Sequence, residues 1–185
     1  MTDREGVQLS EVASLLGRVP QPPGESLPHG ASAPMIESWE SRNFIRLPPK
    51  MKAWLQSCNG PCVGPGGVSG IGTKRKSQDL DALMNLHPDW RSRGWVPVAG
   101  DGAGNYYVVA TKGEFGPGEP VLFIDVGVDE SVPAFVAASD TWHFLRFMLK
   151  KELGESRWPF SKDEVVLMDP SVETFTSVAL PWDAS

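Results

Sequence analysis

Apolar residues recur at two different spacings along the chain, and the change of spacing marks the predicted elements. Spacing typical of helices occurs over residues 7–19, 35–42, 47–59 and 77–86. Apolar runs bounded by turn residues predict strands over residues 95–99, 106–111, 121–126 and 132–137. Helices followed by consecutive strands and then further helices indicate an α+β domain with an antiparallel sheet.

The best-defined helix follows the predicted strands. Its apolar residues share one face, and they are Trp142, Leu145, Met148 and Leu149. Ser139 precedes the helix and is the expected cap, with Asp140 next to it. Further along, a short helix is expected to stop at Asp169-Pro170, and residues 172–180 are expected to form a closing strand or an extended tail.

Prolines separate the N-terminal segment from the rest of the chain. Five of them fall between Pro20 and Pro34, a density that supports neither a helix nor a central strand. We therefore predict that residues 1–32 form a short helix and a proline-rich linker, and that residues 33–185 form a single domain. A chain of 185 residues can bury enough surface to fold without a disulfide or a metal.

Charge limits the class of partner. The formal net charge is −6, which argues against nucleic acid as the main partner and favours association with a basic protein. The first residues are polar and no run approaches the roughly 18 apolar residues of a membrane span, so we expect a soluble, cytoplasmic protein with no membrane contact. Cys58 and Cys62 lack a second pair of metal-ligand type, and we expect ordinary reduced thiols.

Motifs that carry chemistry are incomplete. Gly67 to Lys74 approaches a phosphate-binding loop, but Thr73 and Lys74 stand in the reverse of the required order. The glycines of the 100–105 turn are more simply explained by a turn that needs positive φ. The histidines are scattered, and His143 is expected to be exposed on its helix. We therefore expect no catalytic residue, no metal and no cofactor.

Acidic residues gather after the second predicted strand, with no Lys or Arg among them. The group consists of Glu114, Glu119, Asp125, Asp129 and Glu130. Two interpretations stay open at this point. The acids form either the solvated edge of the sheet or a face that meets a basic protein.

Several short landmarks follow one another in a specific order. They are Leu47-Pro48, Asn59-Gly60, Trp95-Val-Pro97, Gly102 with Gly104, and Trp142. In this order and spacing the chain resembles the SUKH superfamily, the Smi/Knr family of cell-wall-assembly regulators, over roughly residues 33–152. It departs from the family pattern at Gly104-Asn105, where Gly-Asp is usual, and at Ala110-Thr111, where a further acid is usual.

The resemblance implies a central, twisted antiparallel sheet flanked by helices. It also implies a non-enzymatic protein, because the bacterial members are mostly immunity proteins that bind and occlude a cognate toxin. We expect the contact on the acidic side of the sheet, with an exposed Tyr107 as anchor. The steering acids would be Asp101, Glu114, Asp125, Asp129 and Glu130.

Two other functions stay open. Fungal relatives suggest an intracellular regulatory scaffold. A small hydrolase or ligand-binding enzyme is a further alternative, because the glycine-rich turn adjoins Tyr106 and Tyr107. A deep polar pocket with a strongly shifted acid would favour the enzyme, and a filled core beneath the turn would disfavour it.

Overall fold

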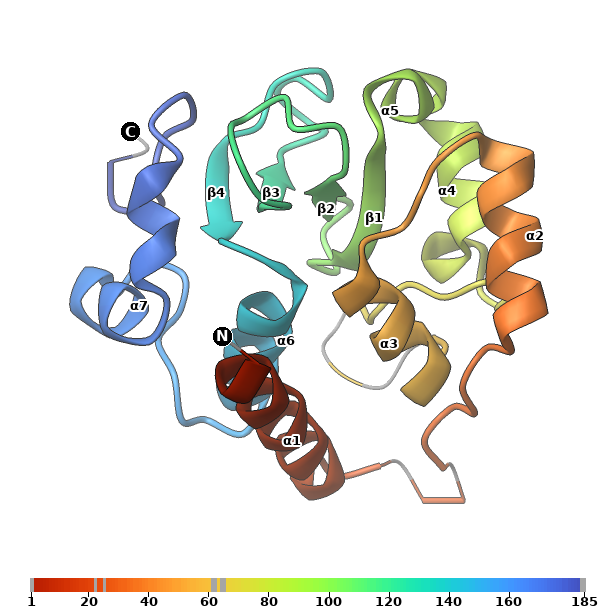
Figure 1. Ribbon diagram of the computed structural model, residues 1–185, viewed down its shortest axis with the longest axis horizontal. Helices are drawn as coiled ribbons and strands as arrows, with labels where there is room; N and C mark the ends of the chain where they lie inside the picture. Colours follow the sequence, from red (N-terminus) through yellow and green to blue (C-terminus); the bar gives the residue numbers. More distant parts are fainter. Residues whose placement is uncertain (1, 22, 25, 61–62, 64–65, 184–185) are drawn as a thin grey trace.

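The computed structural model describes residues 2–21, 23–24, 26–60, 63 and 66–183, with side chains from residue 9 onward (Figure 1). In this part of the chain a four-stranded antiparallel sheet has its strands in sequence order. The strands are β1 (Trp95–Gly100), β2 (Tyr106–Ala110), β3 (Val121–Ile124) and β4 (Phe135–Ala138). The predicted α+β fold is confirmed, and the fourth strand begins three residues later than expected.

Helices cover both faces of the sheet. On one side lie α2 (Ala33–Asn43), η1 (Lys76–Gln78), α4 (Leu80–Leu86) and α5 (Pro88–Arg93), of which η1, α4 and α5 contact β1. On the other side lie α3 (Pro49–Ser57) and α6 (Thr141–Glu152), which contact each other. Figure 1 shows α7 (Lys162–Met168) beyond β4, at the opposite end of the sheet from α2.

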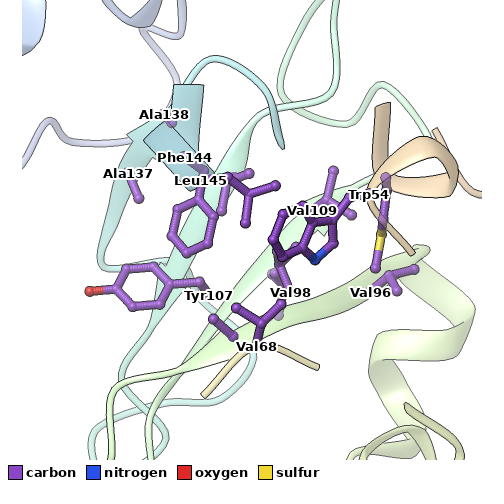
Figure 2. Close-up of a cluster of buried hydrophobic side chains, with 14 of the residues drawn as sticks. Trp54, Val68, Val96, Val98, Tyr107, Val109, Ala137, Ala138, Phe144 and Leu145 are labelled. Carbon is purple, nitrogen blue, oxygen red and sulfur yellow. The ribbon is translucent and has the colours of Figure 1, made fainter. Parts of the chain in front are cut away.

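The core lies between the sheet and the pair α3 and α6. Figure 2 shows Trp54 from α3 and Phe144 from α6 in one cluster with valines of β1 and β2. Trp54, Val98, Val109 and Phe144 are all buried. Because successive residues of a strand point to opposite faces, Tyr107 faces this cluster, whereas Tyr106 contacts Trp90 of α5 on the other face.

The landmark residues form the framework of the fold. Trp95 and Trp142 are buried, and Leu47 is buried immediately before Pro48, the residue that precedes α3. The Asn59 side chain both accepts from the amide and donates to the carbonyl of Ile71, at 2.7 and 2.9 Å, and Gly60 follows with a φ of 127°. These contacts tie the end of α3 to the segment that leads toward the sheet.

The N-terminal helix α1 (Thr2–Arg18) packs against α6. Val12, Leu15 and Leu16 are buried and belong to the same core as the sheet. The Nε of Arg146 on α6 lies 2.9 Å from a carboxylate oxygen of Glu11. The helix is longer than the predicted 7–19 segment, and the domain boundary at residue 33 stays a prediction.

Short segments hydrogen-bond to the two outer strands of the sheet. On the β1 side the Ser69 amide donates to the Val98 carbonyl at 2.8 Å, beside a register shift that follows Pro97, a residue without an N–H. On the β4 side the Val136 amide donates to the Ala179 carbonyl at 2.9 Å. Of the two forms expected for residues 172–180, the closing strand is wrong. Residues 170–174 form the 3₁₀ turn η2 (Pro170–Thr174), and turns at residues 176–177 and 181–183 follow it.

Among the described residues, none of the helices combines the length and the apolar character required to cross a membrane.

Candidate protein-binding surface

The turn between β1 and β2 is built around one carboxylate. Asp101 accepts hydrogen bonds from the amides of Ala103 and Asn105 at 2.7 and 3.0 Å, and from the Asn105 side chain at 2.9 Å. Gly102 and Gly104 have φ values of 85° and 102°, so they supply the left-handed conformations that the sequence predicted for a turn. Asp101 thus holds the turn, and its oxygens are directed largely at neighbouring donors.

Asn105 explains one departure from the family pattern. Its amide group donates to Asp101, and its carbonyl oxygen accepts from the Val126 amide at 3.1 Å. An aspartate at this position would place a second carboxylate against Asp101 and could not donate. The asparagine therefore joins the turn to the β3–β4 loop and brings Asp101 and Asp125 to the same end of the sheet.

Two cavities flank this turn, one on each face of the sheet. The cavity on the Tyr106 side has a volume of about 190 Å³, and the one on the Tyr107 side about 150 Å³. Arg75, Ser77 and Gln78 line the first, which is polar, together with glycines of the turn. Burial, assisted by Asp101, raises the pKa of Tyr106, and the lining of this cavity includes no carboxylate. Both volumes are below the roughly 300–1,000 Å³ of small-molecule sites, so neither side of this turn offers a pocket of that size.

The expectation of an exposed Tyr107 is wrong. Only 8% of this residue is exposed, and its ring contacts Phe123, Phe144 and Trp158 at centroid distances of 5.0, 4.9 and 5.4 Å. The cause is its strand position, which faces α6. Figure 2 shows its hydroxyl pointing away from the valines of the core, and burial followed by the charge of Asp101 raises the pKa of this hydroxyl.

Two residues, one at the end of α5 and one between α4 and α5, reach part of the acidic group. Arg93 pairs with Glu114, donates to the Ser131 carbonyl and lies 3.7 Å from the centre of the Trp95 ring. His87, which is 5% exposed, lies 2.6 Å from a carboxylate oxygen of Glu130. The continuous acidic face is therefore interrupted, because Glu114 and Glu130 meet cationic or ionisable partners that lie far away in the sequence.

The loop between β3 and β4 carries the remaining acids. Asp125 accepts from the Val128 amide at 3.2 Å. Asp129 accepts from the amide and hydroxyl of Ser131 at 2.8 and 2.6 Å, and these bonds, with the charge of Arg93, lower the pKa of Asp129. Both carboxylates thus shape the loop, and Asp129 also carries its charge on the exposed surface.

Two apolar side chains in this loop were missed by sequence reasoning. Val128 is 82% exposed and Val132 is 56% exposed, on either side of Asp129 and Glu130. The signal in the sequence was the placement of valines within a glycine-containing acidic turn, where a strand pattern no longer applies. The loop therefore presents exposed apolar area and negative charge side by side.

A polar cluster lies under the start of α6. Asp140 is the N-cap, in place of the predicted Ser139, and its side chain accepts from the amides of Trp142 and His143 at 2.8 and 3.0 Å. Lys50 from α3 lies 2.8 Å from the second oxygen of Asp140. Burial opposes ionisation, but the hydrogen bonds and charges of His143 and Lys50 outweigh it and hold the pKa of Asp140 well below its usual range.

The prediction that His143 is exposed is wrong, since only 12% of its side chain is accessible. Its Nδ1 lies 3.0 Å from Asp140, 3.9 Å from the buried Asp169 and 3.4 Å from the Ser139 hydroxyl. Burial lowers the pKa of His143, but the two carboxylates outweigh burial and raise it overall. These residues line neither cavity beside the turn, and we assign them to holding α3, α6 and the C-terminal segment together.

Within the described ranges, no group of three or more His, Cys, Asp or Glu side chains is placed to hold a metal ion. Cys58 is buried, and Cys62 lies outside the described residues.

The comparison with family models identifies the fold family. The model of the SMI1 / KNR4 family (SUKH-1) matches residues 30–146. The chain belongs to this family. The matched range begins just before α2 and extends into α6, so it includes the whole sheet and both the β1–β2 turn and the β3–β4 loop. No curated protein and no solved structure matches the chain.

Proposed function

We propose that this protein is a non-enzymatic immunity protein that binds a cognate toxin and neutralises it by occlusion. Membership of a family that includes immunity proteins supports the proposal. The observation that carries it is the β3–β4 loop, where Val128 is 82% exposed between Asp125 and Asp129. The loop is fixed to the β1–β2 turn through Asn105, so the contact residues stand on a rigid sheet.

Charge and apolar surface have separate roles in this proposal. With a net charge of −6, the protein attracts a basic partner, and the exposed Asp129 contributes to the association rate. Val128 and Val132 supply apolar area that is removed from water only in the complex. A stable complex buries roughly 1,600 Å² in total, which requires the loop and the neighbouring turn together.

The six residues predicted for partner contact differ in how far they are already engaged within the chain. Asp125 and Asp129 are the strongest candidates for steering, because Glu114 and Glu130 meet Arg93 and His87 within the chain. The carboxylate of Asp101 accepts hydrogen bonds within the β1–β2 turn. Tyr107 contributes through the cavity it lines and not as a projecting anchor.

The first test is affinity capture from the native cell, followed by co-expression of the captured protein in a sensitive host. Recovery of a toxin whose lethality this protein suppresses supports immunity. A captured partner without toxicity supports the regulatory scaffold instead, and the absence of any polypeptide partner contradicts both binding functions.

Matched variants then locate the contact. Val128→Ser is compared with Leu167→Ser, since Leu167 is 83% exposed and belongs to α7, outside the β3–β4 loop. We expect Val128→Ser to raise the dissociation constant by roughly tenfold through faster dissociation, because burial of a valine contributes about 1.5 kcal/mol or more. Equal effects of the two variants would contradict the placement on the β3–β4 loop.

Asp129→Asn tests the steering role. The asparagine keeps an acceptor for Ser131 and loses the charge, so the loop is preserved while the electrostatic attraction is reduced. We expect slower association at low salt and a smaller difference at high salt. Glu173→Gln, an exposed change of the same charge in η2, is the control and should leave the association rate unchanged.

A further inference from the structure

The cavity on the Tyr107 side of the β1–β2 turn lies between that turn and the last turns of α6. Its volume is about 150 Å³. This is the size of one side chain rather than of a small-molecule ligand, since ligand sites usually measure 300 Å³ or more, roughly. The lining consists of Gly100, Asp101, Tyr107, Met148, Lys151, Glu152 and Trp158.

Two aromatic rings form a fixed base for this cavity. Tyr107 and Trp158 are 8% and 3% exposed, and their ring centroids are 5.4 Å apart. Trp158 donates to the Ala137 carbonyl at 2.9 Å and stacks on Phe147 with an angle of 6° between the rings. Because both rings are held from below, the base is present before any partner arrives.

The rim carries two acids and one base. Asp101 belongs to the turn, whereas Glu152 is exposed on α6 next to Lys151. The ammonium group of Lys151 lies 5.5 Å from the centre of the Trp158 ring. A cation over the face of this tryptophan is therefore an arrangement that the chain itself already adopts.

We propose that this cavity receives an arginine side chain of the partner protein. The inference rests on the proposed function for the existence of a basic protein partner. A guanidinium group stacks on an aromatic face and donates to carboxylates in one plane, which fits the base formed by Trp158 and the rim formed by Asp101 and Glu152. The aliphatic stem lies against Met148, as such stems do on apolar surfaces. A leucine would fill the same volume but offer no donor to Glu152 or to the remaining acceptor capacity of Asp101.

The test needs no toxin. The full chain is titrated with N-acetyl-arginine amide, N-acetyl-lysine amide and N-acetyl-leucine amide while amide and indole signals are followed by NMR. We expect the arginine probe to shift the signals of Asp101, Lys151 and Trp158 most strongly. Equal or larger shifts with the leucine probe, or none with the arginine probe, overturn the proposal.

Two neighbouring substitutions predict opposite effects. Glu152→Gln removes a charged acceptor at an exposed position and should lower the affinity for the arginine probe about two- to fivefold. Lys151→Gln removes the competing cation and should raise this affinity by a similar factor. The affinity for the leucine probe should change in neither variant, and Glu173→Gln should leave the affinity for every probe unchanged. If both variants change the affinity for the arginine probe in the same direction, the arginine site is wrong.

Failure of this inference can be told apart from failure of the proposed function. If a captured toxin binds Glu152→Gln and Lys151→Gln as it binds the native protein, immunity stands and the arginine site is wrong. If the arginine probe behaves as expected and no toxin is captured, the site stands and the immunity function is wrong.

Discussion

Asp140→Ala should destabilise the protein strongly although it removes only a short side chain. The carboxylate caps α6 by accepting hydrogen bonds from the backbone amides of Trp142 and His143. It also forms an ion pair with Lys50 from α3. Removing it therefore takes away a helix cap and leaves two partly buried cationic or ionisable groups facing each other.

The magnitude follows from these contacts. Loss of an aspartate N-cap costs about 0.5–2 kcal/mol. Breaking a fully buried ion pair costs about 3–5 kcal/mol, but the Lys50 side chain is 23% exposed and can turn toward water, so we assign about 1–2 kcal/mol to this part. The total is about 1.5–4 kcal/mol. Asp140→Asn keeps an acceptor for the cap and loses the ion pairs, so about half of this loss is expected.

Urea denaturation at several pH values measures the effect. The pKa of Asp140 lies well below its usual 3.8, so its contribution is present above that value and is lost as the pH falls through the folded-state pKa. The pKa of His143 lies above its usual 6.5, so its contribution is complete below 6.5 and declines as the pH rises through the folded-state pKa. The difference between native protein and Asp140→Asn should be largest between pH 4 and 6.5, roughly. A loss below about 1 kcal/mol for Asp140→Ala would refute the reasoning.

Three further substitutions test other parts of the fold by denaturant midpoint. Leu15→Ala should lower the free energy of unfolding by about 2–4 kcal/mol, because Leu15 is 5% exposed and α1 packs against α6. Leu9→Ala is the control and should cost much less, because Leu9 is 41% exposed. Equal losses would mean that α1 does not pack on α6. Phe44→Gly should stabilise the protein by about 1 kcal/mol, since Phe44 has a φ of 55° and is 90% exposed, and a destabilised variant would show that the ring has a structural role. Asp169→Asn keeps an acceptor for the Ser139 amide, which the carboxylate binds at 2.7 Å, and removes a carboxyl whose pKa burial raises. The stability of the native protein should fall as the pH rises from 3.8 through the folded-state pKa of Asp169, and the variant should not show this fall. Identical pH profiles would contradict a raised pKa of Asp169.

The local pattern of the sequence was enough to predict the strands. Trp95 to Ala99 and Tyr106 to Thr111 are apolar runs closed by glycines, and the turn between them needs positive φ at Gly102 and Gly104 whatever surrounds it. The hairpin therefore follows from residues close together in the chain. The family resemblance extended this local result to the whole sheet, and the match over residues 30–146 confirms it.

Burial of single side chains depended on segments distant in the sequence. Tyr106 and Tyr107 are equivalent in the pattern, and α6 determines that Tyr107 is the one enclosed against Phe144 and Trp158. His143 is enclosed because Asp169 returns to it from the far end of α7. The acids were misjudged for the same reason, since Arg93 approaches Glu114 from another element.

The short segments along the two outer strands restrict how this protein can meet a partner. A bare outer strand offers unpaired amides and carbonyls on which another chain can add a strand. Here the Ser69 amide donates to the Val98 carbonyl of β1, and the Val136 amide of β4 donates to the Ala179 carbonyl. These contacts make strand addition less accessible, and we expect recognition through side chains at the ends of the sheet. Variation in the β3–β4 loop can change the choice of partner without opening the sheet to self-association.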